Sequence, residues 1–313
     1  MEILTLTVNP AVDVSTAVEQ VVDTHKLRCE AAIRHPGGGG INVARVIQRL
    51  AGAQADCVAL YLAGGIAGDV LEQMLAEEGV ASRRLPIAGE TRENFSVKER
   101  ATGREFRFVL PGPLVSAAEW ATVLDVLASL APAPRYLVLS GSLAPGMGAQ
   151  TYAEVAKLAH ARRVRVVLDT SGPPLALALE AGVYLVKPSL GELAELAGHA
   201  LDDDAAQVAA ARRLVEERRA DIVALTLGDR GALLVSSDET IRVDALPVPV
   251  SSAIGAGDSF LAGLLVALRR GDGLTTAARL AQAAASATLL TAGTALCDAK
   301  QVMRLYEAAS PVS

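Results

Sequence analysis

The sequence predicts an α/β fold, a doubly wound and mostly parallel sheet flanked by helices, with a small β-sheet lid. Short apolar runs alternate along the chain with longer segments of helical period, which is typical of βαβ units. Some runs, such as 136–139, are apolar throughout, as expected for strands covered on both faces. Two stretches, 14–35 and 90–109, lack a long helical pattern and predict the separate small sheet.

The elements of the main fold follow from these runs in chain order. We expect strands at 2–8, 57–63, 136–140, 164–169, 183–187, 222–227 and 231–236. We expect helices at 41–52, 68–79, 116–130, 149–161, 174–181, 189–197, 205–219, 257–270, 274–292 and 298–309. In an open sheet of this kind, ligands bind in the crevice at the carboxyl ends of the strands.

The small sheet is predicted from an alternation of polar and apolar side chains. Residues 94–98 alternate, Thr102-Gly103 supplies a turn, and 105–108 alternate again, which indicates a hairpin of half-exposed strands. We therefore divide the chain into a core of 1–13, 36–89 and 110–313 and a lid of 14–35 and 90–109. An exposed sheet with one apolar face needs a cover, either a ligand or a second subunit.

The composition excludes several classes of protein. Of the 313 residues, 51% are hydrophobic and 20% charged, so the chain is not a disordered polymer. The net charge of −6 and the aromatic content of 3% argue against nucleic acid as a partner, and the acidic balance argues against a membrane surface. The three cysteines and four histidines lack the spacing of a disulfide framework or a zinc site. Without a signal-peptide pattern or a membrane-spanning stretch, we expect a cytoplasmic enzyme.

A run of four glycines, 37–40, leads directly into the helix expected at 41–52. Glycines allow a ligand to approach the backbone closely, and the helix start offers unpaired N–H groups. Asn42, with its donor and acceptor, suits a hydroxylated ligand. A flexible connector is the alternative interpretation. The run matches neither the G-x-G-x-x-G of dinucleotide-binding folds nor a P-loop.

A second glycine turn, Gly255-Ala256-Gly257, opens the helix expected at 257–270 and carries Asp258. Successive N–H groups of such a turn can hold an anion. A carboxylate placed there can act as a general base, while the N–H groups stabilise an incoming phosphoryl group. Asp258 as a simple helix cap is equally compatible with the sequence.

Other charged residues give weaker signals. Lys187 ends an expected strand and Glu192 follows within the next helix turn, so they can meet a phosphate and a magnesium-bound water, or be ordinary solvated residues. Cations in the predicted lid, among them Arg92 and Arg107, can clamp a phosphate or simply be solvated.

Five motifs in this order resemble the ribokinase-like sugar kinases, the phosphofructokinase B family. They are N-P-A-x-D at 9–13, G-G-x-x-x-N-V-A at 37–44, V-K-P-x-x-x-E at 186–192, T-L-G-x-x-G-A at 226–232 and G-A-G-D-S-F at 255–260. The resemblance covers essentially the whole chain. It implies a kinase that uses ATP and Mg²⁺, with K⁺ as a further cofactor, and a homodimer joined through the lid sheet.

The resemblance also implies roles for individual residues. Asp258 matches the catalytic base, and the anion hole matches Gly255, Ala256 and Gly257. The family positions that contact the sugar hydroxyls correspond to Asp13, Gly38, Gly39 and Asn42. The positions near the sugar phosphate correspond to Lys26, Arg28, Arg92, Arg107 and Ser142. The residues that match the nucleotide and magnesium region are Lys187, Ser189, Glu192, Thr226 and Gly228. Among them, Glu192 would hold magnesium through water. The wall beside the adenosine would consist of Ser252, Gln282 and Ser286. A monovalent-cation site matches Ser252, Ile254, Thr288, Thr291 and Gly293.

Within the family, the segments 26–29, 36–42, 91–94, 106–109 and 140–143 look most like the branch that phosphorylates O1 of fructose 6-phosphate in glycolysis. Kinases of fructose 1-phosphate or tagatose 6-phosphate commonly have a lysine where this chain has Gly39. Those two activities remain alternatives, and a catalytically silent sugar-phosphate sensor is a third. The chain departs from the family pattern at Ser189, where an Asn is usual, and at Ala253, where a Thr is usual.

Overall fold

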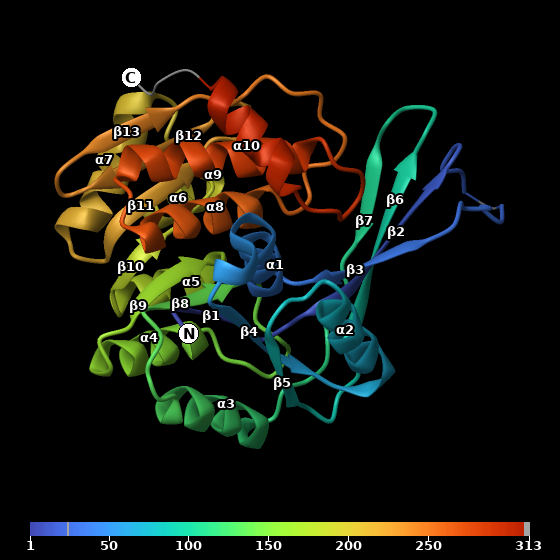
Figure 1. The fold of residues 1–313 in the computed structure, drawn as a ribbon, viewed down its shortest axis with the longest axis horizontal. Helices are drawn as coiled ribbons and strands as arrows, with labels where there is room; N and C mark the ends of the chain where they lie inside the picture. The colour runs from blue at the N-terminus through green and yellow to red at the C-terminus, as the bar shows by residue number, and fades with distance from the viewer. Residues whose placement is uncertain (24, 310–313) are drawn as a thin grey trace.

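The main sheet has nine strands in the order β13-β12-β11-β10-β9-β8-β1-β4-β5 (Figure 1). The computed structural model describes residues 1–23 and 25–309. Neighbouring strands are parallel except at the β11–β12 and β12–β13 pairs, so the mostly parallel sheet is confirmed. The strands are β1 Ile3–Thr7, β4 Cys57–Ala63, β5 Ser82–Pro86, β8 Tyr136–Ser140, β9 Arg165–Asp169, β10 Val183–Val186, β11 Ala220–Thr226, β12 Ala232–Ser236 and β13 Thr240–Val243.

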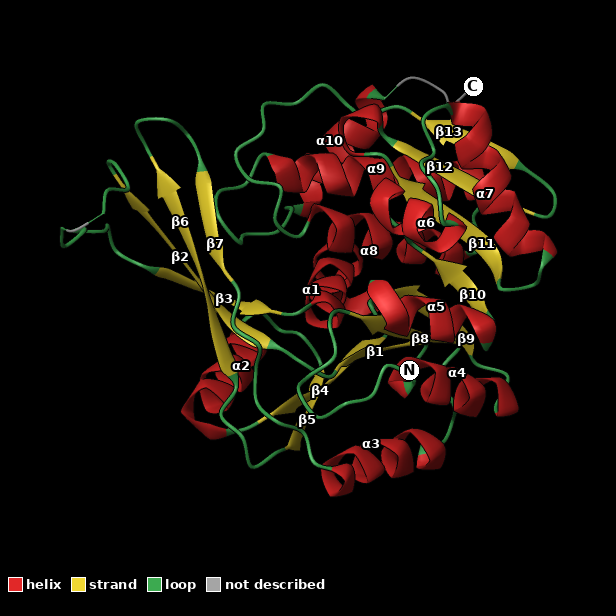
Figure 2. Cartoon of the chain, turned by 180° about the vertical axis from the view of Figure 1, so that it is seen from behind, coloured by secondary structure: helices red, strands yellow, loops and turns green. Residues whose placement is uncertain are grey.

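Helices cover both faces of this sheet, as expected for a doubly wound fold (Figure 2). One apolar core lies under α1 Gly39–Ala51, α2 Gly65–Glu77, α8 Ala256–Arg270, α9 Leu274–Leu289 and α10 Ala299–Ala308. The other lies under α3 Ala117–Ser129, α4 Thr151–Ala161, α5 Gly172–Glu180, α6 Leu190–Ala197 and α7 Asp204–Glu216. Two 3-10 turns, Gly52–Gln54 and Gly228–Arg230, also belong to this part of the fold.

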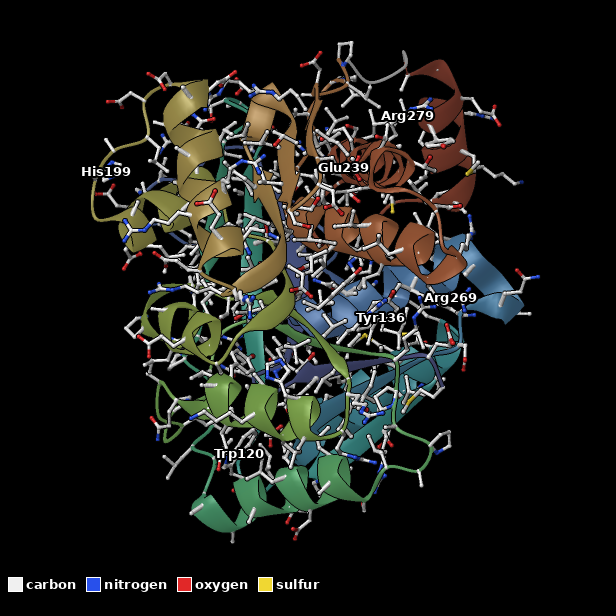
Figure 3. The ribbon with its side chains drawn as sticks, turned by 90° about the vertical axis from the view of Figure 1, so that its left-hand side faces the viewer. Trp120, Tyr136, His199, Glu239, Arg269 and Arg279 are labelled. Atoms are coloured by element: carbon white, nitrogen blue, oxygen red, sulfur yellow. The ribbon has the colours of Figure 1, made fainter. Side chains whose placement is uncertain are left out.

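Side chains at the helix starts explain several boundaries. Ser116 and Glu119 form a capping box that begins α3. From the same helix, Trp120 Nε1 donates to Glu154 Oε2 at 2.9 Å, which ties α3 to α4 (Figure 3). Asp203 and Asp298 cap α7 and α10 by accepting from backbone N–H groups.

A second sheet of four strands, in the order β3-β2-β6-β7, projects from the side of the body (Figure 1). Its strands are β2 Ala11–Val18, β3 Ile33–Gly37, β6 Arg92–Glu99 and β7 Glu105–Phe108. The β6–β7 pair is antiparallel and turns at Gly103, so the predicted hairpin is confirmed. The exact division of the chain into core and lid stays a prediction, and residues 24 and 310–313 of that division lie outside the described residues.

The small sheet has two chemically different faces. Residues opposite one another in the strand register share a face, so the register shows which side chains lie together. On the outer face, Val14 lies opposite Phe95, and Phe95 lies opposite Phe108. Phe95 is 41% exposed and Phe108 is 55% exposed, so this apolar face is uncovered in the single chain. The inner face carries polar pairs, including Asp13 with Asn94.

All the strands and helices expected for the main fold are found, and the differences lie at its edges. The sequence did not predict β5 and β13, which are the two edge strands. β5 reads Ser-Arg-Arg-Leu-Pro and buries only Leu85 fully, so it lacks the apolar run of a central strand. None of the described helices is long and apolar enough to cross a membrane.

Candidate active site

The two glycine-rich helix starts, the carboxyl ends of two central strands and the first turn of α6 meet at one cavity of about 290 Å³. Strands β8 and β9 contribute Ser140 and Asp169, which are their last residues, and α6, which follows β10, contributes Glu192. Helices α1 and α8 contribute Gly39 and Asp258. The cavity is lined by Gly39, Ser140, Gly141, Ser142, Asp169, Thr170, Ser171, Glu192 and Asp258. The crevice expected at the carboxyl edge of the sheet is therefore present.

Asp258 is the third residue of α8 and does not cap it. The N-cap is Gly255, which has a left-handed φ of 78°, and a Cβ at this position would lie 2.5 Å from Leu296 Cδ2. The Asp258 carboxylate instead accepts a hydrogen bond from Asn42 Nδ2 at 2.9 Å. The structure thus aims Asp258 at α1, across the cavity, and separates it from the role of a helix cap.

Burial raises the pKa of Asp258 to about 7, and the neighbouring carboxylate of Asp169 adds to this rise. The hydrogen bond from Asn42 and the positive charge of Lys187 act in the opposite direction, while Asp13 raises the pKa slightly further. A carboxylate that titrates near neutral pH is well matched to accepting a proton from a hydroxyl group.

The first glycine run forms the start of α1 and is not a flexible connector. Gly38 is the N-cap with a φ of 111°, and the Asn42 N–H donates to Gly38 O at 2.9 Å. A Cβ on Gly39 would collide with Ser140 Oγ as that hydroxyl is now placed, so glycine lets α1 approach β8 closely without moving Ser140. The run therefore brings backbone, instead of side chains, to the wall of the cavity.

Asp169 is a site residue that the sequence reasoning missed. It lies opposite Lys187, whose Nζ is 3.0 Å from Asp169 Oδ1, and Lys187 is only 7% exposed. Burial is the largest influence on Lys187 and lowers its pKa, but the carboxylates of Asp169, Asp258 and Glu192 together outweigh it, so the pKa of the lysine is raised. Burial also raises the pKa of Asp169, against the attraction of Lys187. A usable signal existed, because Asp169 ends a predicted strand, as Lys187 does, and both strands point to the same edge.

Ser189 and Glu192 begin α6 as a capping box. Ser189 Oγ accepts from the Glu192 N–H at 3.3 Å, and Glu192 Oε2 accepts from the Ser189 N–H at 2.7 Å. Serine and asparagine are both good N-caps, so the departure from the family pattern at Ser189 preserves this helix start. Thr226 donates from its N–H to Pro188 O at 3.0 Å, which brings the 226–228 turn beside this loop.

In the lid, the structure brings Arg107 and Arg92 near Asp13 and leaves Lys26 and Arg28 apart from it. Asn94 Nδ2 donates to Asp13 Oδ1 at 2.9 Å, and Arg107 lines the same small pocket on the inner face. The Arg92 guanidinium donates to the carbonyl oxygens of Asn9, Pro10 and Leu110 at the base of the sheet. Lys26 and Arg28 lie exposed between β2 and β3, and neither lines the cavity nor this inner-face pocket.

Ser142 lies at the mouth of the cavity, where its Oγ is 3.4 Å from the donor Asn9 Nδ2. The residues predicted for the adenosine wall divide into two groups. Gln282 and Ser286 are one turn apart on α9, both buried, and joined by a hydrogen bond of 3.2 Å. Ser252 instead donates to Glu105 Oε2 of β7 at 3.1 Å, so it contacts the lid.

Of the residues predicted for a monovalent cation, Thr288 lies in the last turn of α9, Thr291 and Gly293 follow that helix, and Ser252 and Ile254 precede α8. Thr288 Oγ1 donates to Ser259 Oγ at 2.7 Å, and Thr291 Oγ1 donates to Thr288 O at 2.7 Å. Gly293 has a φ of 57°, and a Cβ there would meet Ser15 of β2. The loop that follows α9 therefore reaches the lid.

The cavity suits a magnesium ion held mainly through water and phosphate. Within residues 1–23 and 25–309, no three acidic, histidine or cysteine side chains are close enough to bind a metal directly. Three carboxylates, Asp169, Glu192 and Asp258, nevertheless line this one cavity. Magnesium commonly keeps several waters and binds one or two carboxylates together with substrate phosphates. Ser140 Oγ, buried here without a hydrogen-bond partner, is a further polar group that a bound ligand can satisfy.

Comparisons with known proteins agree on one family. A family model described as pfkB family carbohydrate kinase matches residues 7–301. ATP-dependent 6-phosphofructokinase isozyme 2 of Mycobacterium tuberculosis is 43% identical over 308 residues, covering 98% of this chain and 90% of the relative. A 1-phosphofructokinase of Xanthomonas campestris is 35% identical over 292 residues, covering 92% of this chain and 89% of the relative. A crystal structure of Escherichia coli phosphofructokinase-2 in complex with potassium has a TM-score of 0.93 and 35% identity, with 98% of each chain covered.

Proposed function

Because the chain belongs to the pfkB family of carbohydrate kinases, we propose that it transfers the γ-phosphoryl group of ATP to O1 of fructose 6-phosphate. The products are fructose 1,6-bisphosphate and ADP. One observation carries the proposal most directly: the Asp258 carboxylate lies at the start of α8, in the cavity that Ser140, Asp169 and Glu192 also line, with a pKa of about 7.

In this reaction Asp258 accepts the proton of the C1 hydroxyl as the sugar oxygen forms its bond to the γ-phosphorus. The bond from that phosphorus to the β,γ-bridging oxygen breaks, and ADP leaves. The backbone N–H groups of Gly255, Ala256 and Gly257 stabilise the charge on the transferring group. Closure of the small sheet excludes water, which limits hydrolysis of ATP.

The preference for fructose 6-phosphate rests on where cations are found and where they are missing. A Cβ at position 39 would collide with Ser140 Oγ and lie 3.1 Å from Gly141 N, so a side chain there requires the Ser140 hydroxyl to move away. Glycine at this position also supplies no cation. The sugar phosphate must then be held from the lid and the mouth of the cavity, where Arg107 and Ser142 lie. The relatives include both 6- and 1-phosphofructokinases, so phosphorylation of fructose 1-phosphate or tagatose 6-phosphate is the second candidate.

Magnesium and potassium are proposed as cofactors. Glu192 would hold magnesium through water, and magnesium would neutralise charge on the phosphate oxygens. Lys187, Thr226 and Gly228 would contact the nucleotide phosphates, with Gln282 and Ser286 beside the adenosine. The E. coli relative in complex with potassium supports potassium as a cofactor, and we place it near Thr288 and Gly293, where the family resemblance implies a monovalent-cation site.

We also propose a homodimer in the cytoplasm, formed through the outer face of the small sheet. Phe95 and Phe108 lie on this face, and both are exposed in the single chain. A second copy of the same face would cover them, and it would complete a hydrophobic interface around a twofold axis.

The test is a panel of fructose 6-phosphate, fructose 1-phosphate and tagatose 6-phosphate, each with MgATP and with ADP release as the readout. The highest kcat/KM is expected for fructose 6-phosphate, and Asp258→Asn is the inactive reference. A clear preference for fructose 1-phosphate would overturn the substrate while leaving the kinase. Sugar-phosphate binding without ADP release would identify a silent sensor instead.

A further inference from the structure

Arg45 is a buried charge directly behind the proposed catalytic residues. It lies on α1, its side chain is 0% exposed, and it is among the largest fully buried side chains of the described chain. Its Nε and Nη2 donate to the carboxylate of Glu78, at the end of α2, over 2.6–3.1 Å. Its Nη1 donates to Pro36 O at 2.8 Å and to Asn42 Oδ1 at 3.2 Å. The ion pair with Glu78 therefore leaves one arm of the guanidinium for the active-site side of α1.

The contact with Arg45 determines how the Asn42 side chain is oriented. A guanidinium has only donors, so the atom of the Asn42 carboxamide that faces it has to be the oxygen. The amide nitrogen then faces the other way, where Asn42 Nδ2 donates to Asp258 Oδ2 at 2.9 Å. With the carboxamide turned round, donors would face donors at Arg45 and oxygen would face oxygen at Asp258.

We propose that Arg45 is a positioning residue of the phosphoryl transfer, which holds Asn42 as a hydrogen-bond donor to Asp258 and so aims the carboxylate at the substrate hydroxyl. This inference rests on the proposed role of Asp258 as the base. With Oδ2 held by Asn42, Oδ1 is the oxygen left to accept the proton.

A neighbouring arginine provides a matched control. Arg49 lies one turn further along α1, and its Nη2 donates to the same carboxylate, Glu78 Oε2, at 3.1 Å. Its other contacts are to Leu296 O and Cys297 O, and no hydrogen bond joins it to Asn42. Arg45→Lys and Arg49→Lys therefore disturb the same ion pair, but only the first removes the contact that orients Asn42.

We expect Arg45→Lys to lower kcat by about 10- to 100-fold, as small misplacements of catalytic groups do, with the KM values for ATP and sugar phosphate little changed. Arg49→Lys should stay within about twofold of the parent enzyme in kcat. If the lysine ammonium is not tolerated at position 45, Arg45→Met and Arg49→Met form the second matched pair, since methionine fills the volume without a buried charge.

The pH profile of kcat supplies a further readout. The groups that face Asp258 are Asn42 from α1, Asp169 from β9, Lys187 after β10 and Asp13 from β2. Arg45→Lys leaves all four in place and keeps the positive charge, but frees the Asn42 carboxamide to turn. Because the Asn42 donor favours the ionised carboxylate, the acid limb of the profile should move to higher pH in Arg45→Lys and stay in place in Arg49→Lys.

A double-mutant cycle with Asn42→Ala decides whether Arg45 acts through Asn42. Adding Arg45→Lys to Asn42→Ala should cost no further activity, whereas Arg49→Lys should have the same small effect in both backgrounds. Independent, multiplying effects of Arg45→Lys and Asn42→Ala would overturn the inference, as would a lowered melting temperature with unchanged kcat. Should Asp258→Asn prove active while the parent enzyme still releases ADP, the proposed role of Asp258 as the base fails and the kinase activity stands. An inactive Asp258→Asn with independent effects in the cycle removes only the role of Arg45.

Discussion

The two sheets of this protein differ in how their faces are covered, and the difference divides the work of the site between them. The nine-stranded sheet is covered by helices on both faces and places Ser140, Asp169 and Lys187 at its carboxyl edge. The four-stranded sheet has one polar face turned toward the site and one apolar face with exposed phenylalanines. The main sheet therefore carries residues of the proposed chemistry, and our proposal assigns substrate recognition and association to the projecting sheet.

The lid and the core are also joined by specific contacts. Glu105 of β7 accepts hydrogen bonds from Ser252 Oγ and from Ser96 Oγ, and Lys98 Nζ donates to Ser251 O at 3.1 Å. The segment at 251–252 leads within three residues to Gly255, the start of α8. Hydrogen bonds from the small sheet to Ser251 and Ser252 thus link this sheet to the turn that carries the proposed anion hole.

The largest effect is expected for a change at Asp258, the proposed base in the first turn of α8. Asp258→Asn keeps the size of the side chain and removes the base, so kcat should fall by roughly 10²–10⁴ with KM values little changed. Steady-state kinetics with fructose 6-phosphate and MgATP measure this. A kcat near that of the parent enzyme would contradict the division of work, because catalysis would then not depend on α8.

On the outer face of the lid, Phe108→Asp should break the proposed dimer. Placing a carboxylate opposite Phe95 in each copy should weaken association by about 100-fold or more, since central interface aromatics dominate such energies. Light scattering over a concentration series gives the mass. Met303, exposed on α10 of the core, offers a control in Met303→Asp, which should leave the mass unchanged.

On the inner face, Arg107→Ala should raise the KM for the sugar phosphate by roughly ten- to a hundredfold, the equivalent of one charge-assisted contact. The KM for ATP should change little. Arg104, whose guanidinium stacks over Phe106 at 4.9 Å, provides the control, and Arg104→Ala should leave both KM values near those of the parent. Equal rises for both substrates would mean that the lid does not select the sugar phosphate.

The pH dependence should follow Asp258, the proposed base in the first turn of α8. With a pKa of about 7 for Asp258, kcat should fall about tenfold per pH unit well below that value, as the carboxylate becomes protonated. The raised pKa also means that the folded state binds this proton more tightly than the unfolded state. Ionising Asp258 therefore costs stability progressively from its ordinary pKa of 3.8 up to about 7.

Melting temperatures test that cost. Asp258→Asn should be more stable than the parent at pH 8, where the parent carboxylate is ionised, and should differ little near pH 4. A lower melting temperature of Asp258→Asn at pH 8 would show that the carboxylate is not destabilised by its burial.

The smallest effect is expected for Ser189→Asn. Both residues cap helices well, and Glu192 keeps its place in the capping box, so activity and the magnesium needed for half-maximal rate should change by no more than about threefold. Titration of the rate with magnesium measures it. A large loss of activity would show that the magnesium region has been rebuilt around the serine.

Local patterns predicted most of the fold. The central strands are continuous apolar runs, and helices of 3.6-residue period separate them, so the amino-acid pattern alone predicts the parallel sheet. The edge strands β5 and β13 were not predicted, since a strand paired on one side needs less apolar surface, and Ser-Arg-Arg-Leu-Pro has little. The hairpin of β6 and β7 was found because alternation and a Gly turn are both local signals.

The sequence by itself determined which residues can do chemistry: a carboxylate on a glycine turn, a glycine run before an asparagine, and a lysine at the end of a strand. Only the tertiary structure decided what each of them meets. The Asp258 carboxylate accepts a hydrogen bond from Asn42 and does not cap a helix, because α1 packs against α8 and places Asn42 beside it. Asp169 lies in the site because it pairs with Lys187, and the Arg92 guanidinium donates hydrogen bonds to backbone carbonyl oxygens. Both contacts join segments that are far apart in the chain. The physical reason is that hydrogen bonds and pKa values depend on distance and burial, which no local pattern encodes.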